Sequence, residues 1–489
     1  MANPAMLILQ QPKTGTECQA LDVEAQDKHI ALKQEASALD APKVASPDKQ
    51  DRIMHRRHTD HQDNHRQQKT AAILVGMTAT LIGVGLARFA YTPLIPAMIE
   101  ASWFTASQAT QLAAANLLGY LLGAVGAHRL TRIIKVPWVI GGSLLVIILS
   151  FLLCAQPASF GWFYLWRLLS GLAGALLMVC GPSLALALLP VSQRHFGATC
   201  IFMGIGLGIV LSAVLLPPML AHGLTLTWQG LTGLAVLCGL LNLWGLCHLR
   251  PSATTQQPSS ATHNATPAAA AIRLVILAYA LDAAGFIPHT LFWVDYLSRE
   301  IMLGTTKAAF YWGALGIGAV AGPIVAGILS RTLGWNRALL MAFSLKTAAV
   351  LLPAFSQTGW VLWLSAAGVG AMIPGIVALT AGRLAELAHV DQHQRNWGMA
   401  TAAFAGMQAL AGFSFAACYA WLGTYQPFFT VAGLLLGGGT LCVLLAGRRM
   451  QPGQKEVDQL QPTAPYHSAQ KETVKQQETA APALHKETR

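Results

Sequence analysis

Charged side chains are scarce in this 489-residue chain. Only 11% of its residues are Asp, Glu, Lys or Arg, whereas soluble domains contain about 25%. Hydrophobic residues make up 54% of the chain, and its mean hydropathy is +0.48. So little charge cannot cover the surface of a soluble protein of this size, and the composition indicates an integral membrane protein.

Catalytic and metal-binding motifs are also missing. The sequence contains no Walker A element, no HExxH, no GxSxG and no CxxC pair, so we expect no enzyme, no catalytic residue and no cofactor. The one candidate metal ligand set is the histidine series in HRRHTDHQDNH (55–65). A flexible tail loses entropy when it binds a metal, so we interpret this segment instead as a solvated stretch attracted to anionic lipid.

The net charge of +11 does not indicate a nucleic-acid partner. Such a partner requires basic residues gathered on one soluble face, and here they lie in short loops between apolar runs. The first ten residues lack the basic start and the long apolar core of a signal peptide. Met54 is an alternative start of the chain.

The apolar residues form twelve stretches long enough to cross a bilayer, which takes about 20 mostly apolar residues. The Ala- and Pro-rich segment 250–270 separates two sets of six and is predicted to be a linker. This gives an N-terminal bundle at 71–249 and a C-terminal bundle at 271–448, with polar tails at 1–70 and 449–489 that we expect to be disordered. The predicted spans are 71–98, 107–128, 136–155, 160–189, 197–219, 228–249, 271–296, 306–330, 337–356, 359–386, 397–422 and 428–447.

Lys and Arg in short loops predict the orientation, because cytoplasmic loops are enriched in them. One side of the bundle has only Arg299 and Lys307. We therefore expect a multi-pass protein of a bacterial-type cytoplasmic membrane, monomeric, with both termini in the cytosol. The basic residues on the predicted cytoplasmic side are Arg129, Arg132, Lys135, Arg194, Arg250, Arg273, Arg331, Arg337, Arg383, Arg395, Arg448 and Arg449.

The two sets of spans repeat one another. The loop before the fifth span reads Gln193-Arg-His-Phe-Gly197, and the loop before the eleventh reads Gln394-Arg-Asn-Trp-Gly398. Both have the pattern Q-R-x-aromatic-G at the same place in each half. Six plus six spans with internal repeats are typical of a secondary transporter.

Five segments are informative about the family: the loop Gly123–Arg132, its counterpart Gly327–Gly334, the element Arg167–Gly171, and the segments GLARFAYTPLIPAM (85–98) and YALDAAGFIPHTLFWVDYL (279–297). Together they resemble the major facilitator superfamily, and specifically its YbfB/YjiJ-like branch. The resemblance covers residues 71–448. It implies an all-α fold of twelve transmembrane helices in two pseudo-symmetric bundles. The loop aspartates of that superfamily are replaced here by Ala127 and Arg331, so we expect gating on the cytoplasmic side to depend on Arg129, Arg132 and Arg331.

Two ionisable residues inside the spans are the first candidates for function, since charges at that depth usually face a cavity. In the family's fold the first and seventh spans line the central cavity, which implies that Arg88 and Asp282 border the same space. Arg88 either anchors an anionic group or forms a structural pair with backbone carbonyls or Asp295. Asp282 either carries a coupling proton or is a permanently ionised partner of Arg88 or Lys346.

Further residues are weaker candidates. Arg167 has a coupling or gating role by resemblance, and Pro93 and Pro96 should kink the first span and act as hinges. Lys346 is expected to snorkel or to pair between helices. Helix packing is the alternative explanation for all of the remaining cavity candidates, which are Tyr91, Thr92, His289, Trp293 and Gln408.

These features predict a secondary transporter of a small organic solute, with an anion favoured by Arg88 and protons as the expected coupling ion. Two alternatives remain. One is proton-driven export of drugs or amphipathic metabolites. The other is a sensor or scaffold that keeps the fold without transporting.

Overall fold

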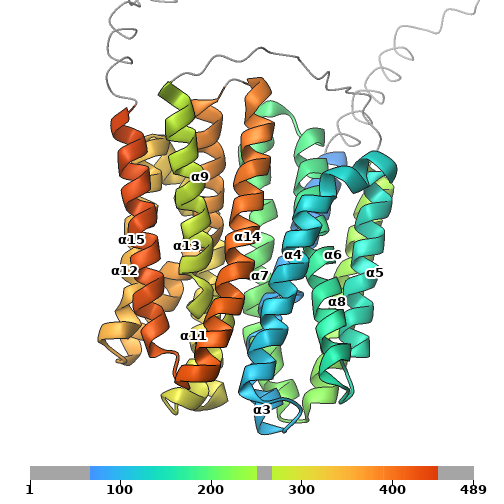
Figure 1. Ribbon diagram of the computed structural model, residues 1–489. Coiled ribbons are helices and arrows are strands. Elements are labelled where there is room, and N and C mark those ends of the chain that lie inside the picture. The colour runs from blue at the N-terminus through green and yellow to red at the C-terminus, as the bar shows by residue number, and fades with distance from the viewer. Residues whose placement is uncertain (1–66, 250–266, 389, 450–489) are drawn as a thin grey trace, which may run out of the picture. The chain divides into compact units, whose positions relative to one another are not determined.

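The computed structural model describes residues 67–249, 267–388 and 390–449, which all belong to one compact unit (Figure 1). The histidine series at 55–65, nearly all of both predicted tails and most of the predicted linker lie outside the described residues. Below, residues 67–249 are called the N-terminal half and residues 267–449 the C-terminal half.

The described chain contains twelve helical spans that are long and apolar enough to cross a membrane. This confirms the predicted all-α fold. The first span is Gln67–Glu100, which includes η1 (Leu81–Leu86), η2 (Phe89–Tyr91) and α3 (Leu94–Glu100); the others are α4 (Ala106–Ile133), α5 (Val136–Leu153), α6 (Phe160–Leu188), α7 (Arg194–Leu220, after η3 at Val191–Gln193), α8 (Leu224–His248), α9 (Pro267–Gly285, continued by η4 at Pro288–Phe292, α10 at Trp293–Asp295 and η5 at Tyr296–Glu300), α11 (Gly304–Leu333), α12 (Trp335–Phe355), α13 (Gly359–Leu387), α14 (Val390–Leu422) and α15 (Gln426–Arg449).

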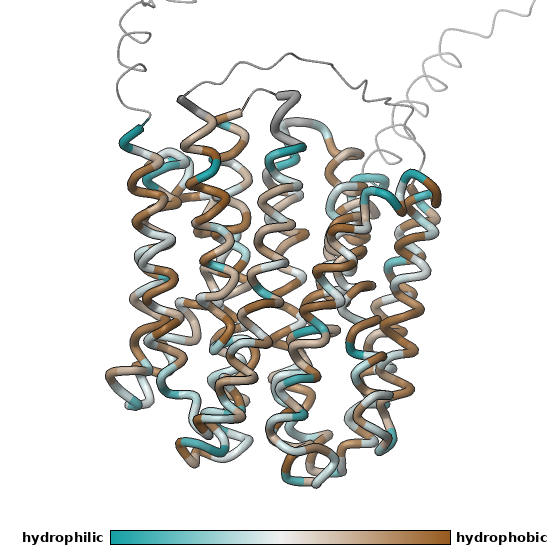
Figure 2. Tube along the Cα trace, in the orientation of Figure 1, coloured by the Kyte–Doolittle hydropathy of each residue, from teal (hydrophilic) through white to brown (hydrophobic). Residues whose placement is uncertain are grey.

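Hydropathy changes along the length of the spans. Apolar residues cover the middle of the spans, and polar residues gather near their ends (Figure 2). Several ends have local stop and start signals. Thr105 and Gln108 form a capping box at the start of α4, and Gly334, at a φ of 75°, makes the tight turn between α11 and α12.

The two halves pack their helices in the same way. A Cβ at Gly171 of α6 would lie 1.9 Å from the carbonyl oxygen of Asn116 in α4, and a Cβ at Gly370 of α13 would lie 2.0 Å from the carbonyl oxygen of Leu315 in α11. Gly119 and Gly123 of α4 meet α6 as closely as Gly318 and Gly322 of α11 meet α13. Each glycine of the N-terminal half has its equivalent the same number of residues further along the chain: Gly370 for Gly171, Gly318 for Gly119 and Gly322 for Gly123. The α4/α6 and α11/α13 contacts are therefore structural repeats.

The first span of each half is irregular. In the N-terminal half the helix passes through the π-helical η1, breaks around Arg88 and continues as η2 and α3 after Pro93. In the C-terminal half α9 is followed by π-helical turns at η4 and η5. Irregular backbone at membrane depth occurs where it is buried in protein or lines a cavity, and π-helical turns are frequent at functional sites.

Candidate functional site

A cavity of about 1710 Å³ lies between the two halves. It extends to the end of the bundle at which the first span begins and α15 ends, which we call the terminal side (top of Figure 1). His128, Glu386 and Arg395 line this mouth and are exposed. Arg88, Phe89 and Phe286 lie at its inner end.

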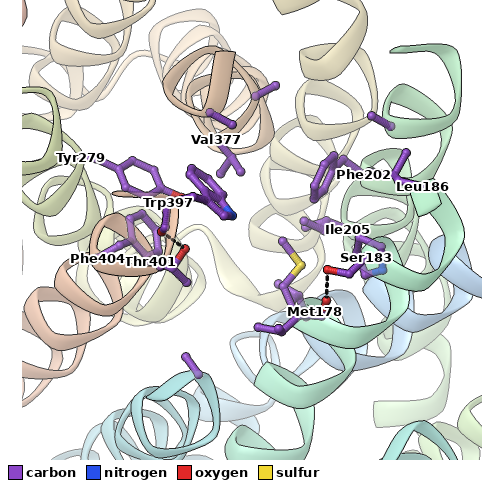
Figure 3. A pocket seen from close by; sticks show the side chains of 18 of the residues that line it. Met178, Ser183, Leu186, Phe202, Ile205, Tyr279, Val377, Trp397, Thr401 and Phe404 are labelled. Atoms are coloured by element: carbon purple, nitrogen blue, oxygen red, sulfur yellow. Dashed lines mark hydrogen bonds between the residues drawn. The ribbon is translucent and has the colours of Figure 1, made fainter. Parts of the chain in front are cut away.

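The two walls of the cavity differ in chemistry (Figure 3). The wall from the N-terminal half presents Met178, Phe202 and Ile205. The wall from the C-terminal half includes aliphatic residues such as Ile373 and Val377 and a series of neighbouring rings, which we call the aromatic ladder. The ladder consists of Trp397, Tyr279, Phe404 and Phe286, with successive ring centroids 5.9, 4.5 and 6.0 Å apart.

Hydrogen bonds between the halves join the bundle at and beyond the inner end of the cavity. Arg88 Nη1 donates to Gln408 Oε1 of α14 at 2.8 Å. Thr92 Oγ1 donates to the carbonyl oxygen of Thr290 at 2.5 Å, and Trp312 Nε1 of α11 donates to Ser212 Oγ of α7 at 3.0 Å. The halves are therefore closed on the far side and open on the terminal side.

Arg88 lines the cavity, is 7% exposed and has no carboxylate partner among the described residues. The sequence of the N-terminal half contains a single acidic residue, Glu100, which is exposed at the end of α3. Both Nε and Nη2 of Arg88 are buried without a hydrogen-bond partner, and so is Nε2 of Gln408. Tyr120 of α4 lines the cavity within electrostatic range of Arg88. Arg88 thus has two donors and Gln408 one that are without a hydrogen-bond partner, and an acceptor group brought to them by a ligand would be stabilised.

Arg167 binds the backbone at the break in the first span. Its Nη1 donates to the carbonyl oxygen of Ala87 at 2.9 Å, and its guanidinium lies 4.2 Å from the centre of the Tyr91 ring. Tyr91 OH in turn donates to the carbonyl oxygen of Ala109. Arg167 and Tyr91 are buried away from the cavity, so the structure places both in positions that support the backbone around Arg88.

Asp282 lies one layer behind the aromatic ladder. It is on the same helix as Tyr279 and Phe286, but its Oδ1 accepts a hydrogen bond from Lys346 Nζ of α12 at 2.6 Å, and both side chains are buried. The Phe286 ring lies between the two cations, with its centre 4.2 Å from Lys346 Nζ and 5.9 Å from Arg88 Cζ. Asp282 therefore does not border the cavity with Arg88; it pairs with Lys346.

Other predicted residues of the seventh span have partners within the C-terminal half. His289 Nε2 is 2.7 Å from Ser365 Oγ, and its ring stacks on Trp293. Asp295 accepts hydrogen bonds from Arg299 and from Tyr425 OH, so it is not a partner of Arg88. Neither His289 nor Trp293 lines the cavity.

The predicted gating residues lie at the two ends of the bundle. Arg129, Arg132 and Arg331 are exposed on the terminal side. Pro93 and Pro96 are at the far side, where Pro93 precedes the first residue of α3. Both prolines follow Thr92, whose hydrogen bond to Thr290 crosses between the halves.

Sequence reasoning named none of the four residues of the aromatic ladder as cavity candidates. Tyr279 and Phe286 occur seven residues apart in the seventh span, with Asp282 between them. That spacing places all three near one face of a helix and was a usable signal. The sequence gives no comparable signal for Phe404, because nothing in α14 indicates which face of that helix lines the cavity.

Comparison with known proteins agrees with this architecture. A family model described as an uncharacterised transporter of the major facilitator superfamily type, YbfB, matches residues 80–445. The chain belongs to this family. No curated protein matches the chain. As a member of the major facilitator superfamily it is a membrane transporter, and the central cavity between its halves is where such a transporter binds its substrate.

Proposed function

We propose that this transporter moves a small organic anion across a bacterial-type cytoplasmic membrane by alternating access. The single observation that carries the proposal is Arg88: a buried guanidinium at the inner end of the central cavity, with two donors unpartnered and no carboxylate within its half that could neutralise it. A charge in that position is costly unless it is paired. A substrate carboxylate supplies the pair, and the planar donor group of arginine suits it geometrically.

The positive-inside pattern supports a cytosolic terminal side, and the cavity would then be open to the cytosol, as in an inward-facing state. Transport then requires the halves to rock about the Arg88 level. Closure on the cytosolic side would bring the exposed ends that carry Arg129, Arg132 and Arg331 towards the opposite half. Opening on the far side would break the Thr92 and Trp312 bonds between the halves. The chain works as a monomer in this scheme, since one chain supplies both halves.

Protons are the proposed coupling ion, with the Asp282–Lys346 pair as their site. The pair is electrically neutral as a unit and is separated from Arg88 by one ring, Phe286. A substrate that neutralises Arg88 alters the electrostatic potential at Asp282 across that ring. A shift of α9 against α12 within the C-terminal half would separate the pair and favour protonation of the carboxylate.

Export of uncharged amphipathic compounds is the second candidate, and the apolar wall formed by Met178, Phe202 and Ile205 favours it. Arg88 separates the two candidates, because only an anion needs it.

The test is transport by the purified protein in proteoliposomes, with a panel of labelled carboxylates and an imposed pH gradient. Arg88→Lys should keep transport with an apparent affinity weakened by roughly tenfold, the cost of one lost charge-assisted bond. Arg88→Ala should abolish anion transport while the protein stays folded. Arg395→Ala, at the exposed mouth, is the matched control. Undiminished anion transport by folded Arg88→Ala would refute the anion assignment.

A further inference from the structure

The aromatic ladder has no role in the anion scheme above. It consists of four rings from α9 and α14, all of which line the cavity, and it runs from Arg88 to the residues near the mouth. Trp397 and Phe404 are half-buried, so part of each ring faces the open space. Neighbouring rings are not needed to make a wall apolar, and the opposite wall is mainly aliphatic.

One buried charged side chain, Arg88, lies at the inner end of the aromatic ladder. Among the described lining residues, Arg88 is the one charged side chain that is buried; His128, Glu386 and Arg395 are exposed at the mouth, and Glu386 accepts a hydrogen bond from Arg383 of its own helix. One buried cation matches one negative charge. A dianion such as a phosphate monoester would leave a charge uncompensated in a nonpolar cavity.

The distance from Arg88 to the aromatic ladder and the volume of the cavity agree with a ligand that contacts both. The Arg88 guanidinium is 5.9 Å from the centre of the Phe286 ring, and the next ring, Phe404, is a further 6.0 Å away. A carboxylate held at Arg88 by a short linker places its own ring beside Phe286 and Phe404. The cavity volume of about 1710 Å³ admits a two-ring compound with its solvation water.

We propose that the substrate is an aromatic monocarboxylate, bound with its carboxylate at Arg88 and its ring system against the aromatic ladder. This proposal rests on the proposed function, because it uses the same Arg88 anchor. The ladder adds selectivity for rings over saturated groups of equal size, since offset and edge-to-face ring contacts contribute beyond the area they bury.

Calorimetry on the purified full-length protein in lipid nanodiscs tests it with three probes of one carbon skeleton: 2-naphthylacetate, its decahydro analogue and 2-naphthylacetamide. We expect 2-naphthylacetate to bind about 2- to 12-fold more tightly than the saturated acid, the range of aromatic pair energies. The amide should bind more than roughly tenfold more weakly than the acid, because it lacks the charge that Arg88 pairs with.

Phe404→Leu and Phe202→Leu form the matched pair of variants. Each removes one cavity-lining phenyl ring, but only Phe404 belongs to the ladder. Phe404→Leu should reduce the preference for the aromatic over the saturated acid to near unity, whereas Phe202→Leu should leave that ratio unchanged.

The outcomes separate the two proposals. Equal binding of the two acids, with both lost in Arg88→Ala, overturns the ladder assignment and leaves the anion transporter intact. Equal binding of acid and amide refutes the anion anchor itself. Absence of 2-naphthylacetate binding to the wild-type protein also overturns the aromatic assignment, and the carboxylate panel in proteoliposomes then tests the anchor independently.

Discussion

The two halves of this transporter share a scaffold and differ in their buried charges. Both pack their second and fourth spans through glycines at matching positions, and both have an irregular first span. The N-terminal half buries Arg88 and Arg167 with a single, exposed acid in its whole sequence. The C-terminal half buries Asp282 with Lys346, and Asp295 with Arg299 and Tyr425.

This difference shows in which half the buried charges are paired. In the C-terminal half, Asp282, Asp295, Glu300 and Glu386 each have a hydrogen-bond partner. In the N-terminal half, Arg167 is satisfied in part by the Ala87 carbonyl and the Tyr91 ring. Arg88 has an amide oxygen from the other half and the rings of Phe89 and Phe286, and no carboxylate among the described residues. The buried cation without a counter-charge is therefore in the N-terminal half, at Arg88, and the proposed anion site rests on it.

Breaking the C-terminal ion pair should have the largest effect. Lys346→Met leaves Asp282 buried and unpaired, and losing one partner of a buried pair costs about 3–5 kcal/mol. The double variant Asp282→Leu/Lys346→Met removes both charges and should recover most of that loss. The measurement is reversible chemical unfolding in detergent, followed by circular dichroism.

The same double variant tests the proposed coupling. In proteoliposomes it should lose accumulation driven by a pH gradient and keep exchange of substrate across the membrane. A stable Lys346→Met protein would contradict the ion pair as a structural element. Gradient-driven accumulation by the double variant would contradict Asp282 as the proton site.

Placing a methyl group at the repeated glycines should have the next largest effect. Gly171→Ala and Gly370→Ala each push a Cβ to within 2.0 Å of a carbonyl oxygen on the facing helix. Overpacking costs about 1–3 kcal/mol, and these sites belong at the upper end because the obstacle is backbone. We expect similar losses in thermal stability for both variants, because the two contacts are repeats.

Gly142→Ala is the control for the glycine variants, since a Cβ there meets nothing within 4 Å and should stabilise α5 by about 0.5–1 kcal/mol. A large loss for one glycine variant and none for the other would show that the halves are not packed equivalently.

Most of the fold could be predicted from the sequence, because apolar length is a local property. The twelve spans and the family follow from hydropathy and short motifs, and both are confirmed. The internal repeat at Gln193 and Gln394 lies at the start of α7 and in the first turns of α14, as expected from equivalent places in the two halves.

The candidate site was less predictable, because it depends on which faces of different helices meet. Lys346 was expected to snorkel or to pair between helices, and it pairs with Asp282. Gln408 was named as a cavity candidate, and the fold brings it to Arg88 across the halves. Spacing along one helix indicates neighbours on that helix only, so the sequence left open whether Asp282 pairs with Arg88 or Lys346 and did not indicate that Gln408 meets Arg88.

The smallest of the expected effects concerns the far-side contact between the halves. Thr92→Val keeps the shape of the side chain but removes the hydrogen bond to the Thr290 carbonyl. One such bond contributes about 0.5–1.5 kcal/mol, so the outward-open population should rise by roughly 2- to 12-fold. Pulsed electron paramagnetic resonance between spin labels at His222 and Thr305, with Cys247 and Cys418 replaced by Ser, measures this population. Thr110→Val is the control, because that hydroxyl bonds only within α4. Identical distance distributions for the two variants would show that Thr92 does not hold the far side closed, and the break in the first span would then serve Arg88 alone.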